Sequence, residues 1–152
     1  MLVPGTARKL VQELDQLFDR ARKQPDLQVQ SDYAKFLVIR VSGLVEQVVT
    51  EIVLAYTQPQ ANPTVTAHVA WRMNSFQNPN IERILQLVGS FNSNWREQLE
   101  YLLTVEERQA LSSINLQRNK IAHGQQSTVS LGQVDQYYAQ IKALITKIAG
   151  LF

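Results

Sequence analysis

The stretch "SDYAKFLVIRVSGLVEQVVTEIVLAY", residues 31–56, has the apolar pattern that decides the fold. Its apolar residues recur at intervals of three and four, and at about 100° per residue they share one face of a helix. The members of this face are Leu37, Val41, Leu44, Val45, Val48, Ile52 and Ala55. We therefore predict one long helix, from Ser31 or Asp32 to Tyr56, with this face in the core.

The segments on both sides of this stretch also have helical patterns. A first helix is expected from Thr6 to about Lys23, ending at "QPDLQ". The last helix is expected to begin at Ser130 with Gln133 and to bury Val134, Tyr138, Ile141, Ile145 and Ile148. Between them we expect four more helices. The first is short and capped by Thr66, and the second has Asn78 as its N-cap and Pro79 at its first position. The third is "REQLEYLL", after the turn "FNSNW", and the fourth begins with a capping box of Thr104 and Glu107. The sequence predicts an all-α bundle of antiparallel long helices plus short helices, in a single domain over residues 1–152.

Composition excludes several classes of protein. The 152 residues contain no cysteine, which excludes disulfides and thiolate chemistry. The net charge of +2 is too small for a protein that binds duplex DNA through contacts to many phosphates. Any nucleic acid would therefore bind at a local site. The longest apolar stretch is interrupted by Arg40, Ser42 and Glu46, well short of a membrane span, and no signal peptide begins the chain. We expect a soluble, cytoplasmic protein without membrane contact.

The segment "QRNKIAHG", residues 117–124, concentrates chemically useful side chains at the end of a predicted helix. At about 100° per residue Arg118 falls within the apolar stripe of Leu111, Ile114 and Ile121. Because a buried arginine needs an anionic partner, either such a group meets Arg118 or its face opens onto a cleft. His123 lies in the last turn, before the helix stop Gly124. It can donate or accept a proton, although a cation there also favours the helix dipole without any chemistry.

Four other side chains have alternative interpretations. Glu46 could be partly buried and pair with Arg118, but the interpretation of a boundary carboxylate that reaches solvent is slightly favoured. His68, beside Trp71, is better explained as a surface or packing residue than as a catalytic one. Tyr137 and Tyr138 could stack on bases, yet their place in an amphipathic stripe favours core or interface packing.

The segment 117–124, together with "LSSIN" before it and "SLGQVDQYYAQIKALITKI" after it, resembles the HEPN superfamily, most closely its RiboL-PSP-HEPN-like branch. The long stretch "FLVIRVSGLVEQVVTEIVLAY" and the segment "NPNIERILQLVGSF" extend the likeness over most of the chain from about residue 30. The family signature is an arginine, then four to six residues of which the first is usually polar, and then a histidine. Arg118, Asn119 and His123 match it.

This resemblance implies an all-α HEPN-type bundle that forms a homodimer, with two such motifs facing a shared cleft, and in many members a metal-independent endoribonuclease. The resemblance implies three catalytic residues. Arg118 would hold the phosphate, His123 would transfer protons, and Asn119 would orient either of them. Lys120 and Glu46 are supporting candidates. No metal ligand set and no cofactor are expected, because His123 has no second histidine at ligand spacing.

The resemblance also suggests partners. RNA is the expected substrate, and a cognate antitoxin or regulatory protein is a further candidate, in a toxin, antiphage or RNA-processing setting. HEPN toxins that are modified by nucleotidyltransferase antitoxins often have a tyrosine two residues after the histidine, where this chain has Gln125, which argues against regulation by that route. The alternative function is a catalytically inactive HEPN dimer that binds RNA or protein.

Overall fold

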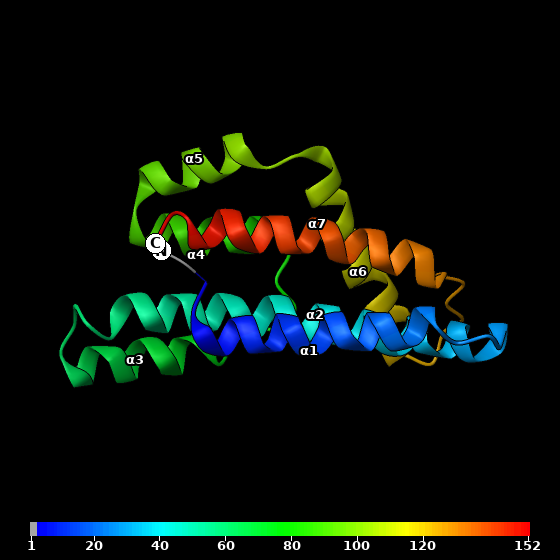
Figure 1. The fold of residues 1–152 in the computed structure, drawn as a ribbon. Coiled ribbons are helices and arrows are strands. Elements are labelled where there is room, and N and C mark those ends of the chain that lie inside the picture. The colour runs from blue at the N-terminus through cyan, green and yellow to red at the C-terminus, as the bar shows by residue number, and fades with distance from the viewer. Residues whose placement is uncertain (1–2) are drawn as a thin grey trace.

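The computed structural model of the protein describes residues 3–152, and within this range the chain forms seven helices and no strand (Figure 1). The helices are α1 (Gly5–Arg22), α2 (Leu27–Thr57), α3 (Pro63–Met73), α4 (Ile81–Phe91), α5 (Ser93–Leu102), α6 (Val105–Ala122) and α7 (Leu131–Ala149). The predicted all-α fold is confirmed.

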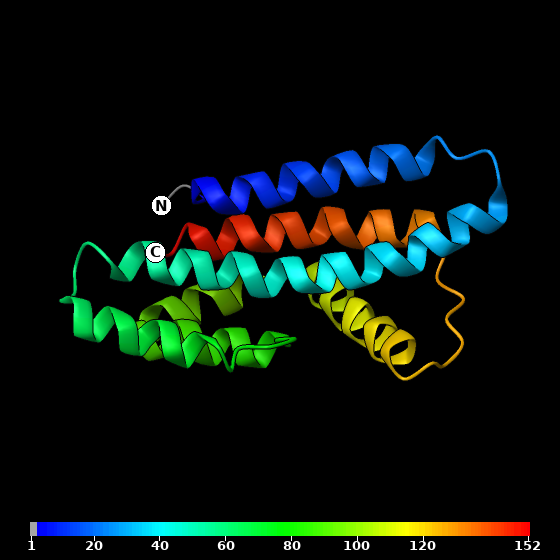
Figure 2. The same ribbon diagram turned by 90° about the horizontal axis from the view of Figure 1, so that it is seen from below.

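Three long helices form the centre of the molecule. α1 runs antiparallel to α2, and α7 packs against both while running in the same direction as α2 (Figures 1 and 2). On the side of α2 away from α1, α3 and α4 lie towards one end and α6 towards the other (Figure 2). α5 follows α4 as its antiparallel partner and also contacts α7.

The core is built from the predicted faces of α2 and α7. Six of the seven α2 residues named above are buried, and Ala55 is half-buried. All five predicted residues of α7 are buried as well. Tyr138 stacks on Phe18 of α1, with ring centroids 4.6 Å apart, and its hydroxyl donates hydrogen bonds to the Val11 carbonyl and to Asp15. Burial and the Asp15 contact raise the pKa of this phenol.

The start of α2 differs from the prediction. The helix begins at Leu27, before the expected Ser31 or Asp32. The reason is Asp26, whose carboxylate accepts hydrogen bonds from the backbone N–H groups of Gln28 and Val29 and so caps the first turn. The residues that directly follow Asp26 are exposed or half-buried. The sequence therefore has no apolar periodicity here that would reveal the first turn of the helix.

The three short helices in the middle also begin elsewhere than predicted. Asn62, not Thr66, caps α3, and Pro63 occupies its first position. Asn80, not Asn78, caps α4. Asn92 caps α5, so the expected turn "FNSNW" is already helical from Ser93. In each case an asparagine accepts a hydrogen bond from a backbone N–H group of the first turn, and the sequence offered more than one candidate for that role.

The capping boxes of α6 and α7 are confirmed. Thr104 and Glu107 exchange hydrogen bonds at the start of α6, and Ser130 and Gln133 do the same for α7. Glu107 is only 2% exposed, and its second oxygen accepts a hydrogen bond from Lys147 Nζ at 2.6 Å. Lys147 also donates to the Leu102 carbonyl. This pair joins the end of α5, the start of α6 and α7, and it helps to fix the direction in which α6 leaves the bundle.

Candidate active site at the end of α6

The last turn of α6 ends in a Schellman motif. The Gly124 N–H donates to the Ile121 carbonyl at 3.1 Å, and the Gln125 N–H donates to the Lys120 carbonyl at 2.8 Å. Gly124 has a φ of 66°, in the left-handed region that favours glycine. The predicted helix stop is therefore confirmed, and it places His123 at the C-cap.

The loop after Gly124 is tied back onto α6. Ser127 is buried, and its hydroxyl donates to the side-chain oxygen of Gln117 at 2.7 Å. Gln117 directly precedes Arg118 in the chain. The loop is thus held against the last turns of α6, which limits the directions that the end of the helix can take.

Arg118 is half-buried, and its Nη1 donates to Asn119 Oδ1 at 3.3 Å. Within residues 3–152 it forms no ion pair with a carboxylate. The sequence left two alternatives for Arg118, an anionic partner or a face that opens onto a cleft. The first is excluded for residues 3–152. A half-buried guanidinium without a carboxylate is suited to bind an anion from outside, such as a phosphate.

The other residues of the segment differ in exposure. Asn119 and His123 are exposed, and Lys120 is half-buried. Over residues 3–152 neither the His123 imidazole nor the Lys120 amine has a hydrogen-bond partner at its side chain. Five positions along a regular helix correspond to about 7.5 Å along the axis and about 140° around it. In a regular helix the two side chains would therefore point in different directions, but α6 ends at Ala122 and His123 is its C-cap.

Glu46 has a structural contact in place of the suggested pairing with Arg118. Its Oε2 accepts a hydrogen bond from the Asn78 N–H at 3.1 Å, and no ion pair with Arg118 is present in the described part of the chain. Ser42 donates to Asn78 Oδ1 at 3.2 Å. Asn78 has a φ of 44°, a conformation that asparagine tolerates better than most residues. These two contacts from α2 hold Asn78 in the loop, which explains why it does not cap α4.

The same loop is also held by α6. Asn115 Nδ2 donates to the Pro79 carbonyl at 3.1 Å, one turn before Arg118. Sequence reasoning missed this contact, because a hydrogen bond between residues so far apart in the chain leaves no local pattern. The asparagines of "NPN" are the only local signal, and of these Asn78 is predicted to be a helix cap.

The remaining candidates lie away from this end of α6. Tyr138 is in the core, as the preferred interpretation had it, and Tyr137 is half-buried. His68 is exposed on α3, with its ring centroid 5.6 Å from that of Trp71. Among residues 3–152, no group of three or more His, Asp or Glu side chains is arranged to hold a metal ion. None of the helices in the same range combines the length and the apolar character needed to traverse a lipid bilayer.

Comparison with known proteins gives one match. The model of the family described as RiboL-PSP-HEPN matches residues 7–152, which is nearly the whole chain and includes every helix from α2 to α7. No curated protein and no solved structure matches the chain.

Proposed function

Because the chain belongs to the RiboL-PSP-HEPN family, we propose that it is a metal-independent endoribonuclease whose site lies at the end of α6 in a homodimer. The observation that carries this proposal is the pairing of a half-buried Arg118 that has no carboxylate partner in the described chain with an exposed histidine at the end of the same helix. The first suits a phosphate, and the second suits proton transfer.

The proposed reaction is the attack of a ribose 2′-hydroxyl on the adjacent phosphorus. The 2′ oxygen forms a bond to phosphorus, the bond to the 5′ oxygen breaks, and a 2′,3′-cyclic phosphate and a free 5′-hydroxyl result. His123 removes the proton of the 2′-hydroxyl or supplies one to the leaving 5′ oxygen, and a second histidine could take the other role. Arg118 stabilises the charge on the phosphoryl oxygens. Asn119 limits the orientation of Arg118 through the hydrogen bond to Nη1.

A homodimer supports this chemistry because of the helical geometry. If the helix stays regular, the directions of Arg118 and His123 differ by about 140° around α6. The two side chains of one chain can then hardly reach the same phosphate. A two-fold axis beside this end of α6 would bring the histidine of one copy towards the arginine of the other. We place the site in such a cleft. Lys120, in the last turn, would add positive charge there.

A second candidate function is a catalytically inactive dimer that binds RNA or protein. It is favoured by the His123 side chain, which has no hydrogen-bond partner to orient it within residues 3–152. For the cell we propose a toxin, antiphage or RNA-processing role, in the cytoplasm, with a cognate antitoxin or regulatory protein as partner. Gln125 stands where some HEPN toxins have a modified tyrosine, so this partner would act by another route.

The test uses the two histidines of the chain. Purified wild-type protein, His123→Ala and the matched control His68→Ala are incubated with mixed single-stranded RNA in excess EDTA. We expect the wild type and His68→Ala to cleave equally, and His123→Ala to lose at least about a hundredfold, as is usual for removal of a general acid–base group. Arg118→Ala should lose a similar amount.

The products discriminate further between mechanisms. The proposed reaction leaves cyclic phosphate ends, whereas a metal-dependent hydrolytic nuclease leaves 3′-hydroxyl ends and stops in EDTA. Full activity of His123→Ala, or loss of wild-type activity with EDTA alone, would refute the proposed mechanism. RNA binding without cleavage by the wild type would favour the inactive module.

A further inference from the structure

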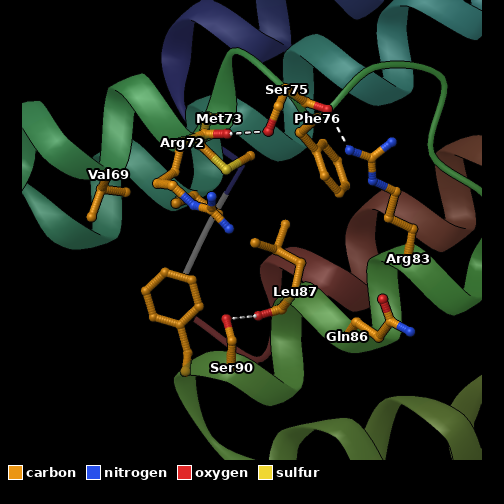
Figure 3. A pocket seen from close by; sticks show the side chains of 11 residues that line it. Val69, Arg72, Met73, Ser75, Phe76, Arg83, Gln86, Leu87 and Ser90 are labelled. Carbon is orange, nitrogen blue, oxygen red and sulfur yellow. Dashed lines mark hydrogen bonds between the residues drawn. The ribbon is translucent and has the colours of Figure 1, made fainter.

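A cavity of about 370 Å³ lies between α3 and α4 (Figure 3), and none of the residues that line it belongs to α6. Its walls include Arg72, Ser75, Phe76, Arg83, Gln86 and Phe91. α3 and α4, both wholly within the described residues, have no pair of Cα atoms within 8 Å of each other. Side chains of α3, of α4 and of the loop between them line this space, together with Val53 of α2, and a groove of this kind can hold a small ligand.

The groove has positive charge and no carboxylate. Two guanidinium groups, those of Arg72 and Arg83, line it, and no aspartate or glutamate does. The sequence contains no acidic residue between Glu51 and Glu82. Glu82 forms an ion pair with Arg96 at 2.9 Å, and this hydrogen bond lowers the pKa of its carboxyl group. The nearest negative charge on α4 is thus already compensated by another residue.

Arg83 is fixed in place by the α3–α4 loop. It donates hydrogen bonds to the carbonyls of Ser75 and Gln77, the latter at 3.3 Å. Its guanidinium carbon lies 5.7 Å from the centroid of the Phe76 ring. These contacts hold the charge of Arg83 in place before any ligand arrives, which lowers the entropic cost of binding.

Arg72 is in a different situation. Its guanidinium has no hydrogen bond and no ion pair with any of residues 3–152. In Figure 3 its side chain extends into the space between Met73 and Leu87. A guanidinium that faces a groove without a partner is free to make a bidentate contact with a phosphate.

The other walls suit a nucleobase. Phe76 and Phe91 line the groove together with Val69 and Leu87. Phe76 is only 5% exposed and has the Arg83 guanidinium beside its ring, so the wall that a base could contact consists of the half-buried Phe91, Val69 and Leu87. Aromatic surfaces next to a positive charge are typical of sites for single-stranded nucleic acid, where bases stack and phosphates meet arginines.

We propose that this groove binds a nucleotide of single-stranded RNA, with Arg72 on the phosphate and the base against the aromatic and aliphatic wall. The inference rests on the proposed RNA function and adds a second contact to it, separate from Arg118 and His123. The α3–α4 loop joins the two places, since Ser75 and Phe76 line the groove and Pro79 is bonded to Asn115 of α6. α3, α4 and α6 lie on the same side of α2 (Figure 2).

The test measures binding without cleavage. Each variant is made in the full-length His123→Ala background and titrated into a fluorescein-labelled single-stranded RNA of about 12 nucleotides, a length typical of such sites. Arg72→Ala is compared with Arg20→Ala, which removes an exposed arginine of α1 and so changes the net charge by the same amount. Anisotropy is recorded over a range of salt concentrations, and circular dichroism checks that all variants are folded.

We expect Arg72→Ala to weaken binding by roughly five- to tenfold and to reduce the slope of log affinity against log salt by about 0.7, as for one phosphate contact with a single strand. Arg20→Ala should stay within about twofold of its parent. If Arg72→Ala behaves like Arg20→Ala while the parent binds RNA, the groove is not the site, and the function proposed for α6 is unaffected. If the parent does not bind RNA, both proposals fail. Binding that depends on Arg72 in a wild-type protein without RNase activity would support the groove alone.

Discussion

Single residues at the end of α6 have roles that depend on backbone geometry as much as on their chemistry. Gly124 ends the helix because its positive φ lets the chain turn back, and the loop is then anchored by Ser127 on Gln117. This ending determines the position of His123, whose own N–H still bonds the Asn119 carbonyl. A change at Gly124 should therefore alter both the stability of the helix end and the placement of the histidine.

We predict that Gly124→Ala destabilises the protein by about 1 kcal/mol, because alanine pays a steric cost at positive φ. A Cβ atom at this position would meet no other atom within 4 Å, so the cost arises from the backbone alone. Gly132→Ala is the matched control, since this residue lies in α7, its Cβ would also meet nothing within 4 Å, and its φ is not positive. The control should be neutral or stabilising, by up to about 1 kcal/mol. Urea unfolding measures both, and equal effects of the two substitutions would contradict the role given to the positive φ.

At the scale of elements, the ends of helices hold the bundle together as much as their faces do. Glu107 caps α6 and receives Lys147 of α7, which in turn contacts the last turn of α5. The α3–α4 loop is held by contacts from α2 and from α6 through Glu46, Ser42 and Asn115. These polar contacts fix how α6 and α4 leave the central helices, and the position of the candidate site follows from them.

We predict that Glu107→Ala destabilises the protein by about 3 kcal/mol, because it removes a helix cap and leaves the Lys147 amine beside the core without its carboxylate. Glu106→Ala is the matched control, an exposed glutamate in the same first turn with no ion pair in the described chain. Its effect should not exceed about 1 kcal/mol, the usual value for a charge near a helix terminus. Chemical denaturation of both variants and of Lys147→Met gives the comparison. A loss from Glu107→Ala no larger than that of the control would show that the buried pair contributes nothing.

For the whole molecule, the proposed mechanism requires one arginine and one histidine of the same helix to act on one phosphate. In a regular helix the two side chains would differ by about 140° in direction, which favours contributions from opposite copies of the chain, with a two-fold axis near the end of α6. The same arrangement would place two α3–α4 grooves on one assembly, so that a single RNA strand could contact a catalytic cleft and a binding groove together. Such combined contacts raise affinity without any single strong site.

We predict a homodimer of about twice the 17.3 kDa chain mass in light scattering at micromolar concentration. We also predict that a heterodimer of Arg118→Ala and His123→Ala chains, purified through two different tags, cleaves RNA while both mutant homodimers do not. One of its two sites would then hold an intact arginine and an intact histidine from opposite chains. A monomer in solution would contradict the shared cleft. A heterodimer as inactive as its parents would show that one chain must supply both residues.

The sequence alone determined the fold class, the long central helix, the buried stripe of α7, the capping boxes of α6 and α7, and the end of α6 at Gly124. These features are local, because apolar periodicity and capping side chains act within a few turns of one helix. The motif Arg118, Asn119 and His123 was also visible in the sequence, through its spacing and its place at a helix end. Its catalytic role stays a prediction.

The tertiary structure alone decided the rest. Which asparagine caps α4 depended on contacts of Glu46 and Ser42 with Asn78, from a helix more than thirty positions earlier in the chain. The packing of α2 against its neighbours decided that Glu46 accepts a hydrogen bond from a backbone N–H group. It also decided that Arg118 forms no ion pair with a carboxylate within residues 3–152. The groove between α3 and α4 brings together side chains from α2, α3, α4 and the loop that contacts α2 and α6. Such contacts join residues far apart in the chain, and a local pattern contains no information about them.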